Sequence, residues 1–304
     1  MTIRVSKRAL KTGAILLLLA LLAACSGAVE TAAPGDEIPE DEIILAIGDL
    51  LVYVPAGPFT MGSGEDDPLA REDEFPAHTV NLSGYFIYRH EVTNAQYKAC
   101  VEAGDCTEPT DLGEGPSTEY NNPEFENNPV VGVNWHQASE FCEWADARLP
   151  TEAEWEKAAR GRYGDPYPWG ADEPSCDLAN MVGCEPDEDI ETYIVAQYPD
   201  GESEYEAQDM AGNVWEWTLD WYDEDYYLVS LNGNPLGPVD GDLKVVRGGS
   251  YENDVVDLRS AARLPLDPED EFNNVGFRCV PVGLSQAANP VQPPICRPPY
   301  IPYC

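Results

Sequence analysis

Positive charge is scarce along this chain. Lysine and arginine together number 17, against 56 aspartate and glutamate residues, and the formal net charge at pH 7 is −39. A chain this acidic repels nucleic acid and anionic membrane surfaces, so we expect neither as a partner. The same charge attracts cations, and oxygen ligands are those that Ca²⁺ prefers. A solvated acidic surface that keeps a secreted protein soluble is the alternative explanation.

A long hydrophobic run is also missing. The apolar stretch from Ala14 to Leu22 is too short for a transmembrane helix. Basic residues precede it and LLAAC follows at Leu21–Cys25, which is typical of a secretory signal. This ending resembles a bacterial lipoprotein box, which implies cleavage before Cys25 and lipidation of its sulfur. An ordinary signal peptide with a coincidental cysteine is the alternative. We therefore expect an exported protein, lipid-anchored at the cell envelope, that contacts the membrane through this lipid only.

Composition divides the chain into four segments. Residues 1–24 are the predicted lipoprotein signal peptide, and residues 25–49 are an acidic, Ala/Pro-rich tether. Residues 50–283 form one folded domain without a recognisable internal repeat. Residues 284–304 are a Pro-rich tail with a pair of cysteines.

Signals for regular structure are sparse in the folded domain. One helix is predicted to begin at Thr93-Asn94 and to end at Gly104, and a second covers the run VNWHQASEFCEWA. A third begins at Thr151, which forms a capping box with Glu154. The remaining segments are short, aromatic and punctuated by Gly and Pro, which favours short strands and long ordered loops. Disulfides or metal ions usually hold such a domain together.

The stretch VVRGGSYENDVVDLRSAAR, Val245–Arg263, lacks what its pattern leads one to expect. It combines a Gly-Gly turn, a serine, an aromatic residue and arginines, as an active-site loop does. Yet it contains no cysteine, no histidine and no obvious acid/base pair, and no cysteine occurs between Lys244 and Arg278.

Several motifs occur together in a characteristic order. They are VYVPAGPFTMGS (Val52–Ser63), GYFIYRHEVTNAQY (Gly84–Tyr97), the run Asn128–Gly161, PWG at Pro168, DMAGNVWEWTLDWY (Asp209–Tyr222), VVRGGSY at Val245 and NVGFRC at Asn274. Together they resemble the formylglycine-generating enzyme family, also called the sulfatase-modifying factor domain, over about residues 50–283. The resemblance implies an irregular α+β fold related to C-type lectins, with little regular secondary structure.

The resemblance also implies a chemistry that this chain is not equipped for. Active members bind Cu(I) through two cysteines and convert a cysteine in a C-x-P-x-R motif to formylglycine. Soft thiolates suit Cu(I), and carboxylates cannot replace them. The position that matches one of these cysteines is Asn253. We therefore expect no copper and no catalytic residue.

The cysteine count favours a disulfide framework. Nine cysteines less the lipidated Cys25 leave eight, an even number for an exported protein. The resemblance implies a long-range bond between Cys142 and Cys279, and a second family disulfide matches Ala159 and Ser260 and is lost. The remaining cysteines lie in close pairs: Cys100 with Cys106, Cys176 with Cys184, and Cys296 with Cys304.

The resemblance further implies structural calcium. One family site matches the side chains of Asp209 and Glu216 and the carbonyls of Gly212 and Val214. A second would comprise Asn180, the Met181 carbonyl, Asp187 and the Asp189 carbonyl. Oxygen ligands from side chains and backbone suit Ca²⁺. Simple acidic turns are the alternative.

A ligand groove is the last expectation from the resemblance. Trp215, Ser250, Tyr251, Arg259 and Arg263 match or lie near the family's substrate groove, and a peptide, protein or glycan ligand is plausible there. Core packing of the aromatic residues and internal ion pairs of the arginines are the alternatives. The histidines, His78, His90 and His136, are far apart and are interpreted as structural.

Three functions follow from these features. We favour a lipoprotein whose domain is a calcium-stabilised, non-catalytic binding or scaffold module. An oxidoreductase that converts a protein cysteine to formylglycine, or does related chemistry, is the first alternative. A surface protein with a variable ligand-binding loop is the second.

The thiol count separates these functions. We expect the denatured, unreduced mature protein to contain no free thiol, and mass-spectrometric mapping to find a Cys142–Cys279 bond. Two free thiols accompanied by bound copper would contradict a non-catalytic role.

Overall fold

The computed structural model describes residues 50–184 and 191–283. The predicted signal peptide, tether and tail lie outside these residues, as do Cys25, Cys296, Cys304, Asp187 and Asp189. Within the described ranges, no helix is long and apolar enough to cross a membrane.

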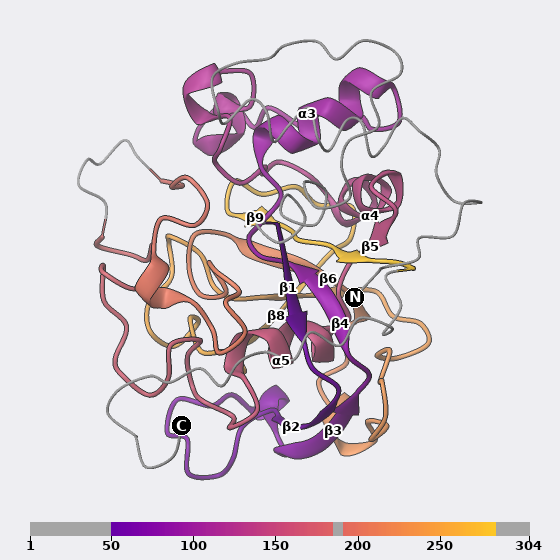
Figure 1. The fold of residues 1–304 in the computed structure, drawn as a ribbon, viewed down its shortest axis with the longest axis vertical. Helices are drawn as coiled ribbons and strands as arrows, with labels where there is room; N and C mark the ends of the chain where they lie inside the picture. Colours follow the sequence, from indigo (N-terminus) through magenta and orange to yellow (C-terminus); the bar gives the residue numbers. More distant parts are fainter. Residues whose placement is uncertain (1–49, 185–190, 284–304) are drawn as a thin grey trace, which may run out of the picture.

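Regular structure is sparse and alternates between short strands and short helices (Figure 1). In chain order the strands and α-helices are β1 (Leu51–Val54), β2 (Gly57–Met61), β3 (His78–Leu82), β4 (Tyr85–Tyr88), α3 (Asn94–Ala103), α4 (Trp135–Trp144), β5 (Ala147–Arg148), α5 (Glu152–Arg160), β6 (Trp215–Trp221), β7 (Lys244–Arg247), β8 (Arg263–Leu266), β9 (Val275–Gly276) and β10 (Val280–Pro281). The 3₁₀ helices are η1 (Glu72–Glu74), η2 (Pro116–Glu119), η3 (Pro123–Phe125), η4 (Pro199–Gly201) and η5 (Tyr226–Leu228).

Each α-helix begins at a capping box. Thr93, Asn134 and Thr151 accept hydrogen bonds from the third backbone N–H of α3, α4 and α5, and the side chains of Gln96, Gln137 and Glu154 bind back to the cap. Helix α3 ends at Gly104, which has φ 81°, the left-handed conformation that glycine adopts without steric cost. The structure therefore contains the three helices that the sequence predicts, and the predicted boundaries differ by a residue or two.

The sheets are small and are joined by long loops. A four-stranded sheet has the order β8-β7-β6-β9, and its β6–β9 pair is parallel. Three two-stranded pairs accompany it: β1 with β4, β2 with β3, and β5 with β10. In Figure 1, α3 lies at one end of the molecule and the β2–β3 hairpin at the other, with the four-stranded sheet and α5 between them.

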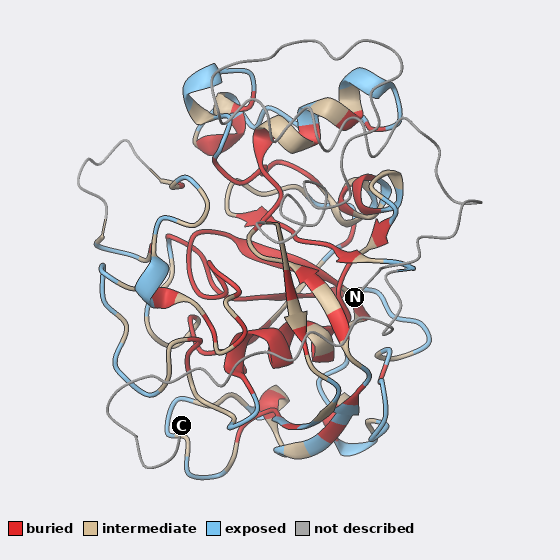
Figure 2. Cartoon of the chain, in the orientation of Figure 1, coloured by how far each residue is buried: buried red, intermediate tan, exposed pale blue. Residues whose placement is uncertain are grey.

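Buried apolar residues gather in two main clusters. One lies under α3 and α4 and includes Tyr97, Phe141 and Trp217, and the other surrounds Trp155 of α5. Buried residues occupy the centre of the molecule, and exposed residues lie at its periphery (Figure 2). Helix α5 is buried along nearly its whole length, although it carries four charged residues between Glu152 and Arg160 that are themselves buried.

Disulfides connect these elements. Cys142 of α4 is bonded to Cys279 across 137 residues, and Cys100–Cys106 and Cys176–Cys184 close short loops. All three bonds agree with the predicted pairs, and every cysteine in the described residues is in a disulfide. In the chain-entropy description, the long-range bond contributes about 5 kcal/mol by restricting the unfolded chain.

Buried ion pairs hold α5 to the sheet. Arg247 of β7 binds the Glu156 carboxylate and lies 3.5 Å from that of Glu152. Arg263 of β8 binds Glu152 at 2.7 Å. These side chains are at most 1% exposed, and burying either partner alone would be costly.

Replacing one partner should therefore destabilise the domain strongly. The substitution Glu156→Gln leaves Arg247 without its closest carboxylate, and we expect it to lower the free energy of unfolding by about 3–5 kcal/mol. The matched control is Glu204→Gln, which breaks the surface pair with Arg162 and should cost about 0–1 kcal/mol. Urea denaturation measures both. Equal losses would show that the buried network does not stabilise the fold.

Candidate functional site

The loop after β7 places Asn253 where the resemblance predicts a copper-binding cysteine. Gly248 and Gly249, with φ 102° and 73°, turn the chain beneath Trp155. A side chain at Gly248 would approach the Trp155 ring to 3.1 Å, so the turn requires a residue without a Cβ.

The Asn253 side chain is fully engaged in hydrogen bonds. Its Oδ1 accepts from Trp215 Nε1 at 2.9 Å, and from the backbone N and Oγ of Ser250 at 3.0 and 2.6 Å. Its Nδ2 donates to Asp257 Oδ2 at 2.6 Å. The amide thus organises the loop, and a hydrogen-bond network occupies the position of the thiol.

The residues predicted to form a groove are instead buried. Trp215, Ser250, Tyr251, Arg259 and Arg263 are each at most 4% exposed. Trp215 and Ser250 meet at Asn253, whereas Tyr251 donates from its hydroxyl to Glu191 Oε2 at 3.0 Å. All five side chains therefore lie in the protein interior, and a ligand groove near them stays a prediction.

Internal ion pairs explain why the two arginines of this set are buried. Arg259 binds both carboxylate oxygens of Glu74 at 2.6 Å, and Arg263 binds Glu152. A buried guanidinium needs a buried anion, and this acidic chain supplies one for each. The internal ion pairs that were the alternative explanation are the ones that form.

The first predicted calcium set lies around Asp209, which has φ 55°. Its Oδ2 accepts from the Ala196 backbone N at 2.6 Å. Glu216 is less available, because Arg278 binds its two oxygens at 2.6 Å and Trp155 donates to it at 2.9 Å. A guanidinium in this position neutralises the carboxylate and reduces its attraction for a cation.

The structure adds Glu91, which the sequence analysis did not select. Glu91 is fully buried, and the charges of Asp209 and Glu91 influence each other. Burial, and next the charge of Asp209, raise the pKa of Glu91 well above its ordinary value, and burial also raises the pKa of Asp209. Glu91 follows His90 in the motif GYFIYRHEVTNAQY, and its place in that motif is the only signal that the sequence offers.

Asn213 connects the first predicted calcium set, around Asp209, to the second, which includes Asn180. It donates to Glu91 Oε1 at 3.0 Å and accepts from Asn180 Nδ2 at 3.3 Å. Among the described residues, Glu91 Oε2 and Asn180 Oδ1 are buried oxygens without a hydrogen-bond partner. Met181 O accepts from Cys184 N at 3.1 Å. No group of three or more His, Cys, Asp or Glu side chains with metal-binding geometry occurs in residues 50–184 and 191–283.

The histidines are separate from these groups. His90 is half-buried, and desolvation lowers its pKa to about 4, so it is neutral at physiological pH. His136 lies 2.9 Å from the Glu269 carboxylate, and His78 Nδ1 lies 3.0 Å from the Pro76 carbonyl. Their separation agrees with a structural role.

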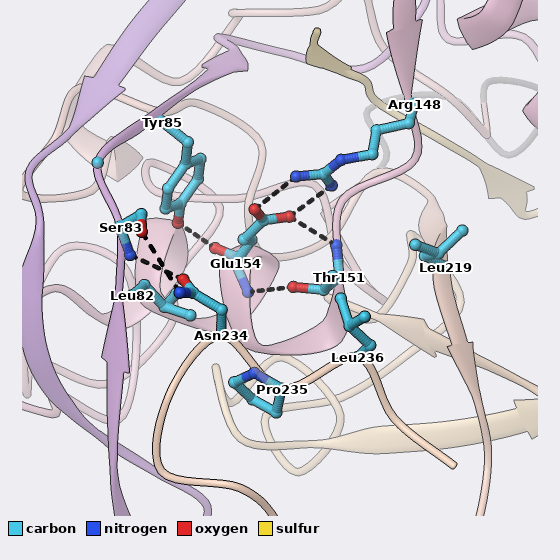
Figure 3. Close-up of a pocket in the computed structure, with 11 residues that line it drawn as sticks. Leu82, Ser83, Tyr85, Arg148, Thr151, Glu154, Leu219, Asn234, Pro235 and Leu236 are labelled. Carbon is cyan, nitrogen blue, oxygen red and sulfur yellow. Dashed lines mark hydrogen bonds and ion pairs between the residues drawn. The ribbon is translucent and has the colours of Figure 1, made fainter. Parts of the chain in front are cut away.

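A pocket of about 400 Å³ lies elsewhere on the domain (Figure 3). Apolar walls come from Leu82, Leu219, Pro235 and Leu236, and Arg148, Ser83, Thr151, Glu154 and Asn234 supply polar groups. Arg148 and Glu154 form a two-point ion pair at 2.6 and 2.7 Å, so their charges compensate each other. None of the predicted groove residues lines this pocket.

Comparison with known proteins assigns the domain to a family. The model of the sulfatase-modifying factor enzyme 1-like domain matches residues 46–282. This chain belongs to that family. The formylglycine-generating enzyme of Streptomyces coelicolor is 33% identical over 279 residues, which cover 75% of this chain and 88% of the relative.

Other members of the family differ in size and name. The serine/threonine-protein kinase Pkn1 of Chlamydia trachomatis is 35% identical over 251 residues, or 75% of this chain, and this chain spans 38% of its length. The solved structure of PvdO from Pseudomonas aeruginosa is 26% identical, has a TM-score of 0.66, and is covered to 93% by 76% of this chain. The irregular, C-type-lectin-related α+β fold predicted from the sequence is thus confirmed.

Proposed function

We propose that this sulfatase-modifying factor domain is a non-catalytic binding or scaffold module, exported and lipid-anchored at the cell envelope and stabilised by calcium. The observation that carries the proposal is the engagement of Asn253. Its amide makes hydrogen bonds to Trp215, Ser250 and Asp257 at the position where active relatives require a thiol.

The cysteines support this proposal. Those of the described residues are all in disulfides, and the exposed Cys176–Cys184 bond lies in the loop that contacts Asn253 through Val182 N, at 3.1 Å from Asn253 O. A Cu(I) site needs unpaired thiolates. The predicted export signal that ends at Leu21–Cys25 supports the proposed location. The disulfides agree with it, because disulfides persist in oxidising compartments.

Calcium fits the buried acids near Asp209. Glu91 and Asp209 would supply carboxylates, and Gly212 and Val214 would supply carbonyl oxygens. A cation there would compensate carboxylates whose burial is otherwise unfavourable, and it would partner the free Glu91 oxygen. Glu216, paired with Arg278, would contribute less than the resemblance implies. Bound calcium would fix the loops that carry Asn180 and Asp209.

The catalytic alternative is tested directly. The protein is incubated with Cu(I), oxygen and a peptide that contains C-x-P-x-R, and mass spectrometry measures formylglycine. We expect no product above a protein-free reaction, whereas the Streptomyces coelicolor enzyme should convert the peptide under the same conditions. Conversion by this protein would overturn the non-catalytic proposal.

Calcium is tested by thermal unfolding with and without chelator. Calcium at 100 times its Kd should add about 2.7 kcal/mol of stability. The substitution Glu91→Gln should abolish this gain and leave the calcium-free protein at least as stable, because burial favours the neutral form of Glu91, which glutamine resembles in shape. Glu72→Gln, at an exposed acid, is the control and should retain the gain. An identical melting temperature of the unmodified protein in calcium and in chelator would rule out structural calcium.

A further inference from the structure

The segment between β6 and β7 exposes apolar side chains to an unusual degree. Leu228, Val229, Leu231, Leu236 and Val239 are 66–98% exposed. Single exposed apolar residues are ordinary on protein surfaces, but a run of them on one segment is typical of an interaction site. We call residues 228–239 the apolar segment.

The backbone of the apolar segment is held in place. Asn81 in β3 donates from its backbone N to the Asn232 carbonyl at 2.7 Å, and its own carbonyl accepts from Asn234 N at 3.0 Å. Asn234 Oδ1 accepts from Ser83 N at 2.8 Å, and Pro235 is buried. A fixed backbone means that presenting these side chains to a partner costs little conformational entropy.

Acidic residues surround the apolar segment on both sides. Asp223, Glu224 and Asp225 precede it and Asp240 and Asp242 follow it, all exposed, and no lysine or arginine occurs from 223 to 243. The two ends are close together, because Tyr222 N donates to the Leu243 carbonyl at 2.7 Å. A partner that covers the apolar residues therefore meets negative charge around them, which favours lysine and arginine at its rim.

The pocket in Figure 3 adjoins this segment. Pro235 and Leu236 belong to its wall, together with Leu82 and Leu219. The charges of Arg148 and Glu154 in this wall are paired with each other. The pocket can accept one apolar side chain of a ligand that lies along the segment.

We propose that the apolar segment and this pocket bind a polypeptide segment of another protein that has apolar side chains flanked by lysine or arginine. The inference rests on the proposed binding role and names its partner class. An anionic membrane is disfavoured by the acidic flanks, and the surface is separate from the loop between β7 and β8.

Binding is measured by fluorescence anisotropy with a labelled synthetic peptide of alternating leucine and lysine. The full chain should bind it, and should bind charge-reversed (Leu/Glu) and apolar-depleted (Ser/Lys) peptides at least about tenfold more weakly. The double substitution Leu236→Ser, Val239→Ser should weaken binding at least about tenfold, and both residues are exposed enough for the fold to persist. Val182→Ser with Ile194→Ser, at exposed apolar residues elsewhere, should leave binding unchanged. Equal binding by both double variants would overturn the proposal.

Cross-linking identifies the occupant. A photoreactive benzophenone amino acid at position 239 of the full chain should cross-link to the leucine–lysine peptide. Cross-links only to residues 284–304, only to a second copy, or only to phosphatidylcholine vesicles would each overturn it. A failure of peptide binding here would not affect the result of the formylglycine assay, which tests the non-catalytic role separately. Formation of formylglycine would overturn that role whatever this surface binds.

Discussion

The buried contact between α5 and Arg247 is the interaction on which the rest of the domain depends. Besides Glu156, Arg247 binds the backbone carbonyls of Ser260, Ala261 and Ala262 at 2.7–2.8 Å. One guanidinium therefore fixes α5, β7 and the end of the loop that follows β7 relative to one another. The resemblance places a disulfide between positions 159 and 260, and here the connection from α5 to Ser260 is carried by this arginine. Since an uncompensated buried charge costs several kcal/mol, few alternative arrangements of the loop are accessible.

The dependence of buried charges on distant partners also explains which features could not be predicted from the sequence. Local signals were sufficient for the helices, because Thr93 and Thr151 cap the helices that follow them whatever surrounds the chain. The cysteine pairs and the fold also followed from the sequence. The fate of Arg259 and Arg263 did not, because their partners Glu74 and Glu152 lie more than a hundred residues away. The parallel β6–β9 pair is likewise set by tertiary packing and not by local pattern. Glu91 was missed for a related reason: only the structure shows that it is buried beside Asp209.

Packing and hydrogen bonds fix the geometry around Asn253. The close approach of Gly248 to Trp155 and the burial of Trp215 are requirements of packing. The amide of Asn253 satisfies both Trp215 Nε1 and Ser250 Oγ, so these hydrogen bonds stabilise the loop. The appearance of an active-site loop in the sequence thus reflects its structural part.

The residues that stabilise the domain differ from those that we propose to bind a partner. The loop between β7 and β8 is held by buried arginines and offers few exposed groups, whereas the apolar segment has a fixed backbone and side chains that face solvent. Apolar side chains that stay exposed after folding gain little from the hydrophobic effect. They gain free energy when a partner covers them and removes their surface from water. In an acidic chain, the surrounding carboxylates keep such a surface soluble and repel a second copy of the same face. The same negative charge would favour a basic partner at the apolar segment in the proposed interaction.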